Sequence, residues 1–325
     1  MNHWERLQAA IRGEALDHPP ISLWRHWPEI DQDPGTLAKA MIDWQQTYDF
    51  DLVKYMPTGT YSIEDWGART IYKPTRNGTR MVTRFGVTDV EQWPRLQPLD
   101  GVSGYMGWQN ESLRIAAEAL GGSVPILQTV FSPLTTARKL AGDVVFEHMR
   151  ARPELLEEGL GIIARTTAAF AREAMRCGAS GLFFATQCST TDVMTEAEYL
   201  RFGRPFDLLV LDSVKESARF NLMHVHGENT MFDLMASYPV DMLNWHDRRA
   251  TPDLRAAASR FSGLLVGGID EWGTLQNGTS AAIGAEIDDA RRQTNGRRLM
   301  LGPGCVCPIE TPAAAVRAAV DAVRL

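Results

Sequence analysis

The sequence contains little cysteine, no long apolar run and no excess of positive charge. Its 325 residues include four cysteines, which are too few and too unevenly spaced for a disulfide framework in a chain of this length. No window approaches the roughly 18 to 20 apolar residues that a membrane-spanning helix needs, and residues 1–12 form an amphipathic pattern unlike a signal peptide. We therefore expect a cytoplasmic protein without a membrane segment, whose cysteines are free thiols or metal ligands.

The charge balance is acidic. The chain has 40 Asp and Glu against 33 Lys and Arg, a formal net charge of −7, so its overall field repels a nucleic-acid backbone. Hydrophobic residues make up 44% and charged residues 22%, which fits a globular protein with a large core. We expect a small-molecule substrate and no nucleic acid; a homodimer is compatible with these features.

Short apolar runs alternate with longer segments of helical period, a pattern typical of βα units around a parallel sheet. The eight runs are residues 20–24, 51–56, 124–131, 181–186, 220–225, 241–245, 263–269 and 298–301. The clearest helical segments are residues 112–120, 134–150, 153–177, 195–217, 280–292 and 312–323. The count predicts an α/β fold, a (β/α)8 TIM barrel that forms one domain over residues 1–325. An open doubly wound sheet is the main alternative.

Residues 62–107, approximately, interrupt this alternation. The segment has the character of short antiparallel strands with a turn at Asn77-Gly78, after the second predicted strand. We predict an antiparallel insertion that covers the mouth of the barrel.

Active sites of such barrels are built where the strands end. Polar residues follow several of the predicted strands here. They are Arg25 and His26, Gln187, His224 and His226, His246 and Asp247, Asp270 and Glu271, and Cys305 and Cys307. The candidate site therefore lies at the carboxyl ends of the strands.

His224, His226 and Cys305 are the strongest candidates for metal ligands. Two histidines at positions i and i+2 of a strand point to the same face, and Cys305 follows the last strand. Two imidazoles and one thiolate suit zinc, and three protein ligands leave a fourth position for a substrate. In the alternative interpretation the histidines are structural or bind substrate, and Cys305 is a buried thiol in a turn. Cys307 is either a further ligand or a packing residue.

Three further residues have two interpretations each. His246 and Asp247 are candidates for proton transfer or for support of the metal ligands, although Asp247 equally fits a loop cap. Arg25 suits a substrate carboxylate, and an ion pair with Asp51 or Asp270 is the alternative.

Several segments resemble the uroporphyrinogen decarboxylase superfamily, which includes cobalamin-linked methyltransferases with a zinc site. They are HPPISLWR, YDFDLVKYMP, VPILQTVFSPLTTARKLAG, CGASGLFFATQC, HVHGENTMFDLMASYPVDMLNWHD, GGIDEWGTLQNGT and LGPGCVCPIETPAAAVRAAV. The resemblance extends almost from end to end and implies the same barrel, with its cleft at the carboxyl ends of the strands.

The motifs favour the methyltransferase branch. Of the two arginines in the MRQAGR-type stretch of the decarboxylases, the first matches Arg25 but the second falls on Glu29, which argues against a tetrapyrrole polycarboxylate. The methyltransferases have a His-x-Cys and a distant Gly-Cys, which match His224 and Cys305, while His226 replaces the first cysteine. An imidazole in place of a thiolate makes the metal more Lewis-acidic, so an acceptor other than coenzyme M, or a methoxy or hydroxyl oxygen, is plausible.

The resulting hypothesis is a zinc-dependent methyltransferase that moves a methyl group between a corrinoid and a small thiol or oxygen compound. His224, His226 and Cys305 hold the metal, His246 and Asp247 are catalytic, and the corrinoid (cobalamin) is presented by a separate protein. The substrate-binding residues we expect are Arg25, Gln128, Gln187 and Asp270. The alternatives are a metal-free decarboxylase of a small carboxylic acid and a non-catalytic corrinoid or metal carrier.

Overall fold

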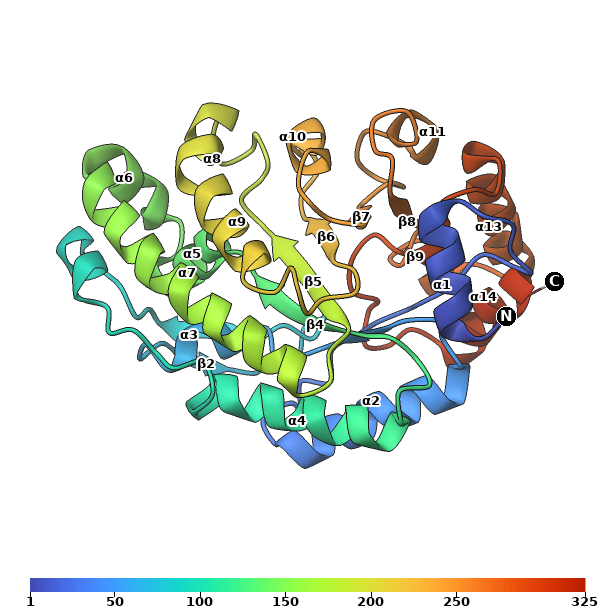
Figure 1. Ribbon diagram of the computed structural model, residues 1–325, viewed down its shortest axis with the longest axis horizontal. Helices are drawn as coiled ribbons and strands as arrows, with labels where there is room; N and C mark the ends of the chain where they lie inside the picture. Colours follow the sequence, from blue (N-terminus) through green and yellow to red (C-terminus); the bar gives the residue numbers. More distant parts are fainter. Residues whose placement is uncertain (325) are drawn as a thin grey trace.

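A curled sheet of parallel strands lies at the centre of the computed structural model, which describes residues 1–324 (Figure 1). Its strands, in spatial order, are β1 (Val53–Tyr55), β4 (Ile126–Phe131), β5 (Gly181–Thr186), β6 (Leu222–Val225), β7 (Met242–Trp245), β8 (Leu264–Ile269) and β9 (Leu299–Pro303). Every neighbouring pair is parallel. Because the spatial order follows the chain order, with no reversal point, the doubly wound alternative is wrong.

The first predicted strand, residues 20–24, forms a single bridge between Ile21 and Leu301. The Leu301 N–H donates to Pro20 O at 2.8 Å, and the Ser22 N–H donates to Leu301 O at 3.0 Å. On the other side, the Asp51 N–H donates to Ile21 O at 2.9 Å. Backbone hydrogen bonds of this segment therefore join β9 to the residues that lead into β1. Pro20 has no N–H to donate, which shortens the pairing.

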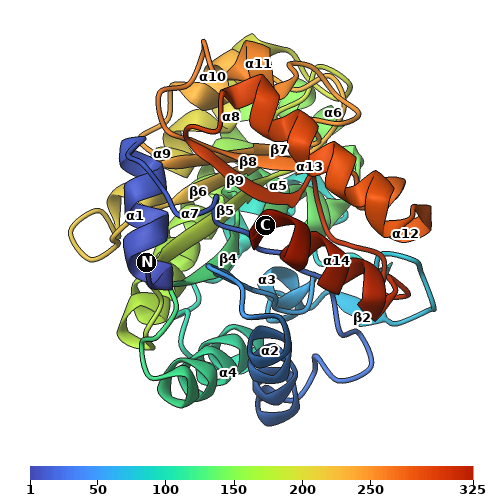
Figure 2. The same cartoon turned by 90° about the vertical axis from the view of Figure 1, so that its right-hand side faces the viewer.

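Helices cover the outside of the sheet, and α2 packs beside α4 as α13 packs beside α14 (Figure 2). They are α1 (His3–Arg12), α2 (Pro34–Tyr48), α3 (Tyr61–Glu64), α4 (Gly104–Leu120), α5 (Pro133–Ala141), α6 (Val144–Ala151), α7 (Pro153–Arg176), α8 (Glu196–Phe202), α9 (Arg204–Asp212), α10 (Phe232–Ala236), α11 (Leu254–Ala257), α12 (Thr274–Asn277), α13 (Ser280–Thr294) and α14 (Ala313–Arg324). No helix within residues 1–324 is both long and apolar enough to cross a membrane.

Two long helices predicted from the sequence are each divided in two. The segment 134–150 breaks at Gly142, whose φ of 71° takes the backbone out of the helical region. The segment 195–217 breaks at Gly203, one residue before Arg204-Pro205, where Pro205 has no N–H to continue the helix.

The predicted insertion contains one antiparallel hairpin rather than a larger set of strands. It pairs β2 (Arg69–Ile71) with β3 (Met81–Arg84), and the remaining elements of residues 62–107 are helical, with the 3-10 helix η1 at Val90–Arg95. Gly78 in the turn has a φ of 74°, and a Cβ there would lie 2.8 Å from the Cβ of His26. The tip of the hairpin is thus closely packed against the end of the first predicted strand.

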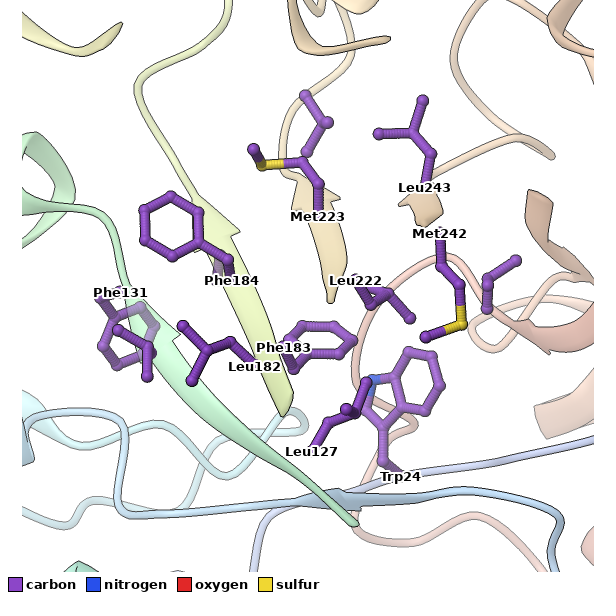
Figure 3. Packing of buried hydrophobic residues seen from close by; sticks show 14 of the residues in the cluster. Trp24, Leu127, Phe131, Leu182, Phe183, Phe184, Leu222, Met223, Met242 and Leu243 are labelled. Atoms are coloured by element: carbon purple, nitrogen blue, oxygen red, sulfur yellow. The ribbon is translucent and has the colours of Figure 1, made fainter. Parts of the chain in front are cut away.

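Side chains on the inner face of the sheet form the floor of the site. Trp24, Phe183 and Leu222 turn toward one another on one side of the strands, whereas Phe184 and Met223 point to the other side (Figure 3). The rings of Trp24 and Phe183 lie 5.5 Å apart, edge to face. Because side chains alternate along a strand, a residue two positions after one of these side chains also faces the interior, nearer the carboxyl end of its strand.

Candidate metal centre

A cavity of about 190 Å³ opens at the carboxyl ends of the strands. Its walls combine apolar rings, three cationic side chains and the predicted metal ligands. Its lining residues include Trp24, His26, Lys54, Met56, Gly59, Asn77, Thr79, Arg80, Thr129, Phe131, Lys139, Phe183, Gln187, His224, His226 and Cys305. Asn77, Thr79 and Arg80 belong to the insertion, which therefore contributes one wall.

The three predicted metal ligands come together in this cavity. His224 lies on β6, His226 directly follows that strand, and Cys305 follows β9. One potential ligand atom from each lies within 4.8 Å of the others, and the Cys305 Sγ is 3.8 Å from His226 Nδ1. Such spacing allows one ion to contact all three, and two nitrogens with one sulfur are a donor set that zinc accepts.

Asn244 determines which nitrogen of His224 faces the cavity. The Asn244 Nδ2 group donates to the carbonyls of Val266 at 2.9 Å and Pro303 at 3.0 Å, so the Oδ1 atom has to act as acceptor. It lies 2.6 Å from His224 Nδ1, which therefore carries the proton. The Nε2 atom of the neutral ring then keeps its lone pair, as a metal ligand requires.

His246 lies directly beside the predicted ligands. The Arg249 guanidinium donates to His246 Nδ1 at 3.1 Å and to the Glu271 carboxylate. Because His246 Nδ1 accepts, its proton is on Nε2, which lies 3.3 Å from His226 Nδ1. His246 is therefore held in one tautomer with an N–H directed at the predicted site.

Burial keeps the three imidazoles neutral. It lowers the pKa of His224 well below its ordinary value, that of His226 to about 4 and that of His246 to about 3, and neighbouring positive charges add to the effect. Burial raises the pKa of the Cys305 thiol to about 11, with the Glu271 carboxylate contributing. At neutral pH the nitrogens are ready to bind a cation, whereas the thiol releases a proton when it binds one.

Gly304 explains how Cys305 reaches His226. A Cβ at position 304 would lie 2.9 Å from the Cα of His246, so only glycine permits this close approach. The Gly304 N–H donates to Glu271 Oε2 at 3.0 Å, which fixes the loop. Cys307, two residues on, is fully buried, donates its N–H to Trp24 O, and is not part of the ligand group.

Among the predicted substrate-binding residues, the structure brings only Gln187 to the cavity wall. Gln128 does not line it: Thr129 faces inward from β4, so Gln128 points to the outer face, where it is fully buried. Arg25 donates to the carbonyl of Ile309 at 2.7 Å and does not line the cavity either.

The two predicted acidic residues cap loops. Asp247 accepts the Gly268 N–H with both oxygens, at 3.1 and 3.0 Å, and burial raises its pKa to about 7. Asp270 accepts the N–H groups of Trp272 and Gly273. Neither lines the cavity, and the loop-cap interpretation of Asp247 fits these contacts.

Lys54, Lys139 and Asn244 belong to the site but were not predicted from the sequence. Lys54 occurs in the strand sequence VKY, where a lysine between apolar residues could have indicated a functional inward-facing position. Lys139 and Asn244 gave no such signal, since Lys139 is part of an ordinary amphipathic helix and Asn244 reads as one polar residue in a short strand.

The family model described as Uroporphyrinogen decarboxylase (URO-D) matches residues 2–325. The chain is 20% identical over 335 residues to the methylcobamide:CoM methyltransferase MtbA of Methanosarcina acetivorans, covering 98% of this chain and 97% of that protein. It is 26% identical over 343 residues to the methylcobamide:CoM methyltransferase MtaA of Methanosarcina barkeri, covering 98% and 96%. A solved structure of a methyltransferase from Methanosarcina mazei superposes with a TM-score of 0.84 at 22% identity, covering 99% of this chain and 98% of the other.

Proposed function

Because the chain belongs to the uroporphyrinogen decarboxylase family, we propose that it is a zinc-dependent methyltransferase of this family. It moves a methyl group between a corrinoid, carried by a separate protein, and a small thiol or oxygen compound. The single observation that carries the proposal is the group of His224, His226 and Cys305, whose ligand atoms meet within 4.8 Å at the wall of a cavity. The relatives that cover nearly the whole chain are methyltransferases, which supports the same reaction class.

The residues present fit a zinc ion. His224 is held in the tautomer that leaves Nε2 free, and the thiol of Cys305 is the soft donor that zinc shares with imidazole. When bound, zinc supplies a Lewis acid that favours the deprotonated form of a thiol or hydroxyl. His246 holds a proton on Nε2 beside the ligands, 3.3 Å from His226 Nδ1. Gln187 is the remaining predicted residue at the wall available to contact substrate.

We also propose that residues 1–325 form one closed (β/α)8 barrel. The hydrogen bonds of residues 20–22 to β9 and to Asp51 support closure. The contact of Gly78 with His26 supports the insertion, residues 62–107, as a cover of the barrel mouth.

The decisive experiment is elemental analysis of protein purified without a histidine tag. We expect about one zinc per chain in the wild type and loss of zinc in His224→Ala and Cys305→Ala, because each removes one of the three ligands. Cys177→Ala is the matched control, since that half-buried cysteine lies at the end of α7 and is not part of the ligand group. A wild type that stays free of zinc after zinc is added back under reducing conditions would remove the proposal.

A second set of measurements distinguishes a methyltransferase from a protein that only carries a corrinoid or a metal. His246→Ala keeps all three ligands, so we expect it to retain zinc but to lose methyl transfer from a methylated corrinoid. A wild type that binds zinc and corrinoid without any turnover would favour the carrier alternative. The decarboxylase alternative required Arg25 to hold the substrate carboxylate, and the contact of Arg25 with Ile309 outside the cavity counts against it.

A further inference from the structure

Glu271 contacts two parts of the candidate metal centre without being part of the ligand group. It is one of the polar residues that follow the predicted strands, and in the structure it comes directly after β8. Its side chain is only 1% exposed. A buried carboxylate is costly unless its oxygens have partners. The partners of its two oxygens therefore indicate what the residue does.

One oxygen of Glu271 holds the loop that carries Cys305. Its Oε2 atom accepts the N–H of Gly304, the residue before Cys305, at 3.0 Å. Gly304 already lies against the backbone of His246, because an added Cβ would be 2.9 Å from the His246 Cα. Loss of the Glu271 acceptor would leave a buried N–H without a partner, so the loop would have to move.

The other oxygen of Glu271 holds Arg249. The Nη2 atom of Arg249 donates to Glu271 Oε1 and, at 3.1 Å, to His246 Nδ1. This nitrogen carries two hydrogens, so it can serve both acceptors at once. Burial raises the pKa of Glu271 to about 7, and the Arg249 guanidinium opposes this rise. The buried carboxylate therefore depends on Arg249, and Arg249 is anchored by the carboxylate.

Arg249 decides which nitrogen of His246 carries the proton. Glu271 Oε1 lies 3.9 Å from His246 Nδ1, which is too far for a hydrogen bond. With Arg249 as donor, His246 Nδ1 has to accept, and the proton stays on Nε2, 3.3 Å from His226 Nδ1. Without Arg249, the Glu271 carboxylate would favour a proton on Nδ1 instead.

We propose that Glu271 is a positioning residue that holds Cys305 and His246 in one arrangement, Cys305 through Gly304 and His246 through Arg249. One side chain thereby joins the residues that follow β7, β8 and β9. The importance of this arrangement for zinc binding and methyl transfer rests on the proposed function. The loop contact and the tautomer of His246 do not, and each can be measured by itself.

Two NMR measurements on the full-length protein, as purified, test the two contacts. Long-range proton–nitrogen correlations of labelled histidine identify the protonated nitrogen of His246, and hydrogen exchange of labelled glycine reports on the Gly304 N–H. In the wild type we expect the proton of His246 on Nε2 and a Gly304 N–H that is protected from exchange. A wild-type His246 protonated on Nδ1 would overturn the inference.

Arg249→Met and Glu271→Ala separate the two contacts. In Arg249→Met we expect the proton of His246 to move to Nδ1 and the exchange of the Gly304 N–H to stay unchanged, because Glu271 still accepts it. In Glu271→Ala we expect the Gly304 N–H to exchange at least about tenfold faster, and His246 to populate both tautomers because Arg249 loses its anchor. Glu310→Gln, at an exposed glutamate after β9, is the control and should change neither measurement.

Glu271→Gln is the conservative variant. An amide has one oxygen, so we expect this variant to keep one of the two contacts and to lose the other. Thermal unfolding identifies a variant that fails to fold. Arg249→Met, at a side chain that is 37% exposed, then shows whether His246 depends on the pair. If both measurements stay at their wild-type values in correctly folded Glu271→Gln, the inference is wrong.

Zinc affinity, measured by competition with a chromophoric chelator, extends the test to the metal. We expect Glu271→Ala to bind zinc about tenfold to a hundredfold more weakly, because the Cys305 loop is released, and Arg249→Met to stay within about threefold of wild type. A wild type without zinc would remove the proposed function, and the two NMR measurements would still decide the inference. A zinc-binding wild type whose His246 tautomer and Gly304 exchange survive both substitutions would overturn the inference and leave the proposed function intact.

Discussion

A single amide group, that of Asn244, decides whether His224 can act as a metal ligand. The two donated hydrogen bonds leave Asn244 Oδ1 with no role except acceptor, and this choice fixes the proton on His224 Nδ1. A residue outside the group of predicted ligands therefore fixes the tautomer of one of them. Such support of ligands is commonly as important as the ligands themselves.

Asn244→Ala tests this role of the amide. Without the acceptor, the His224 ring is free to turn and to exchange tautomers, so we expect zinc affinity to fall about tenfold to a hundredfold. Competition of the zinc-loaded protein with a chromophoric chelator measures the change, and Asn229→Ala, at an exposed asparagine, is the control. An unchanged zinc affinity in correctly folded Asn244→Ala would contradict the role assigned to this amide.

Elements rather than single residues explain what the sequence could and could not predict. The period-two alternation predicts that His224, on β6, and His226, directly after it, point to the same side, and both lie at the cavity wall. The same rule could not be applied to β4, whose six residues ILQTVF are all buried. When both faces of a strand are buried, the sequence carries little information about which face looks inward. The sequence therefore predicts Gln128 at the cavity, whereas Thr129 lines it in the structure.

A titratable carboxyl group, that of Asp207, is buried where α8, α9 and the residues after α10 pack together. Asp207 of α9 accepts the hydroxyl protons of Tyr199 at 2.8 Å and Tyr238 at 3.0 Å, and its Oδ1 has no partner among the described residues. Burial raises its pKa to about 7. The folded state therefore keeps a proton on this carboxyl at pH values where the unfolded chain, with a pKa of about 3.9, has lost it.

This difference predicts a dependence of stability on pH. Between about pH 4 and pH 7 the folded state binds more protons at Asp207, so its contribution to the free energy of unfolding decreases as the pH rises, and it is constant above that range. Asp207→Asn removes the contribution. We expect the variant to gain stability relative to wild type, on the order of 2 kcal/mol, between pH 4.5 and pH 8.

Urea unfolding at several pH values measures this gain. Asp233→Asn, at a mostly exposed aspartate on α10, is the control and should follow the wild type at every pH. A difference between Asp207→Asn and wild type that stays the same at pH 4.5 and pH 8 would contradict the assignment.

At the scale of the whole molecule, Asp51 joins three parts of the chain. It is fully buried, its Oδ1 contacts His3 at 3.0 Å and Arg6 at 2.5 Å on α1, and its Oδ2 accepts the Ile21 N–H at 2.9 Å. The carboxylate thus ties the first helix and the segment 20–24 to the entrance of β1.

We expect Asp51→Ala to destabilise the fold by at least about 2 kcal/mol, because His3 and the Ile21 N–H lose their buried acceptor and Arg6 keeps only Asp17 as a charged partner. The free energy of unfolding in urea, followed by tryptophan fluorescence, measures the effect. Asp43→Ala, which breaks an exposed ion pair with Lys39, should cost less than about 1 kcal/mol. Equal losses in the two variants would show that Asp51 has no special role in joining these parts.

The bridge between Ile21 and Leu301 brings together residues from nearly opposite ends of the chain. While the protein is being synthesised, the first of these residues leaves the ribosome long before the second, and until β9 is made the segment 20–24 and β8 each have an open edge. A truncated chain that ends before β9 would keep both edges exposed. Because an unpaired strand edge can pair with another chain, we expect such fragments to aggregate when they are produced alone.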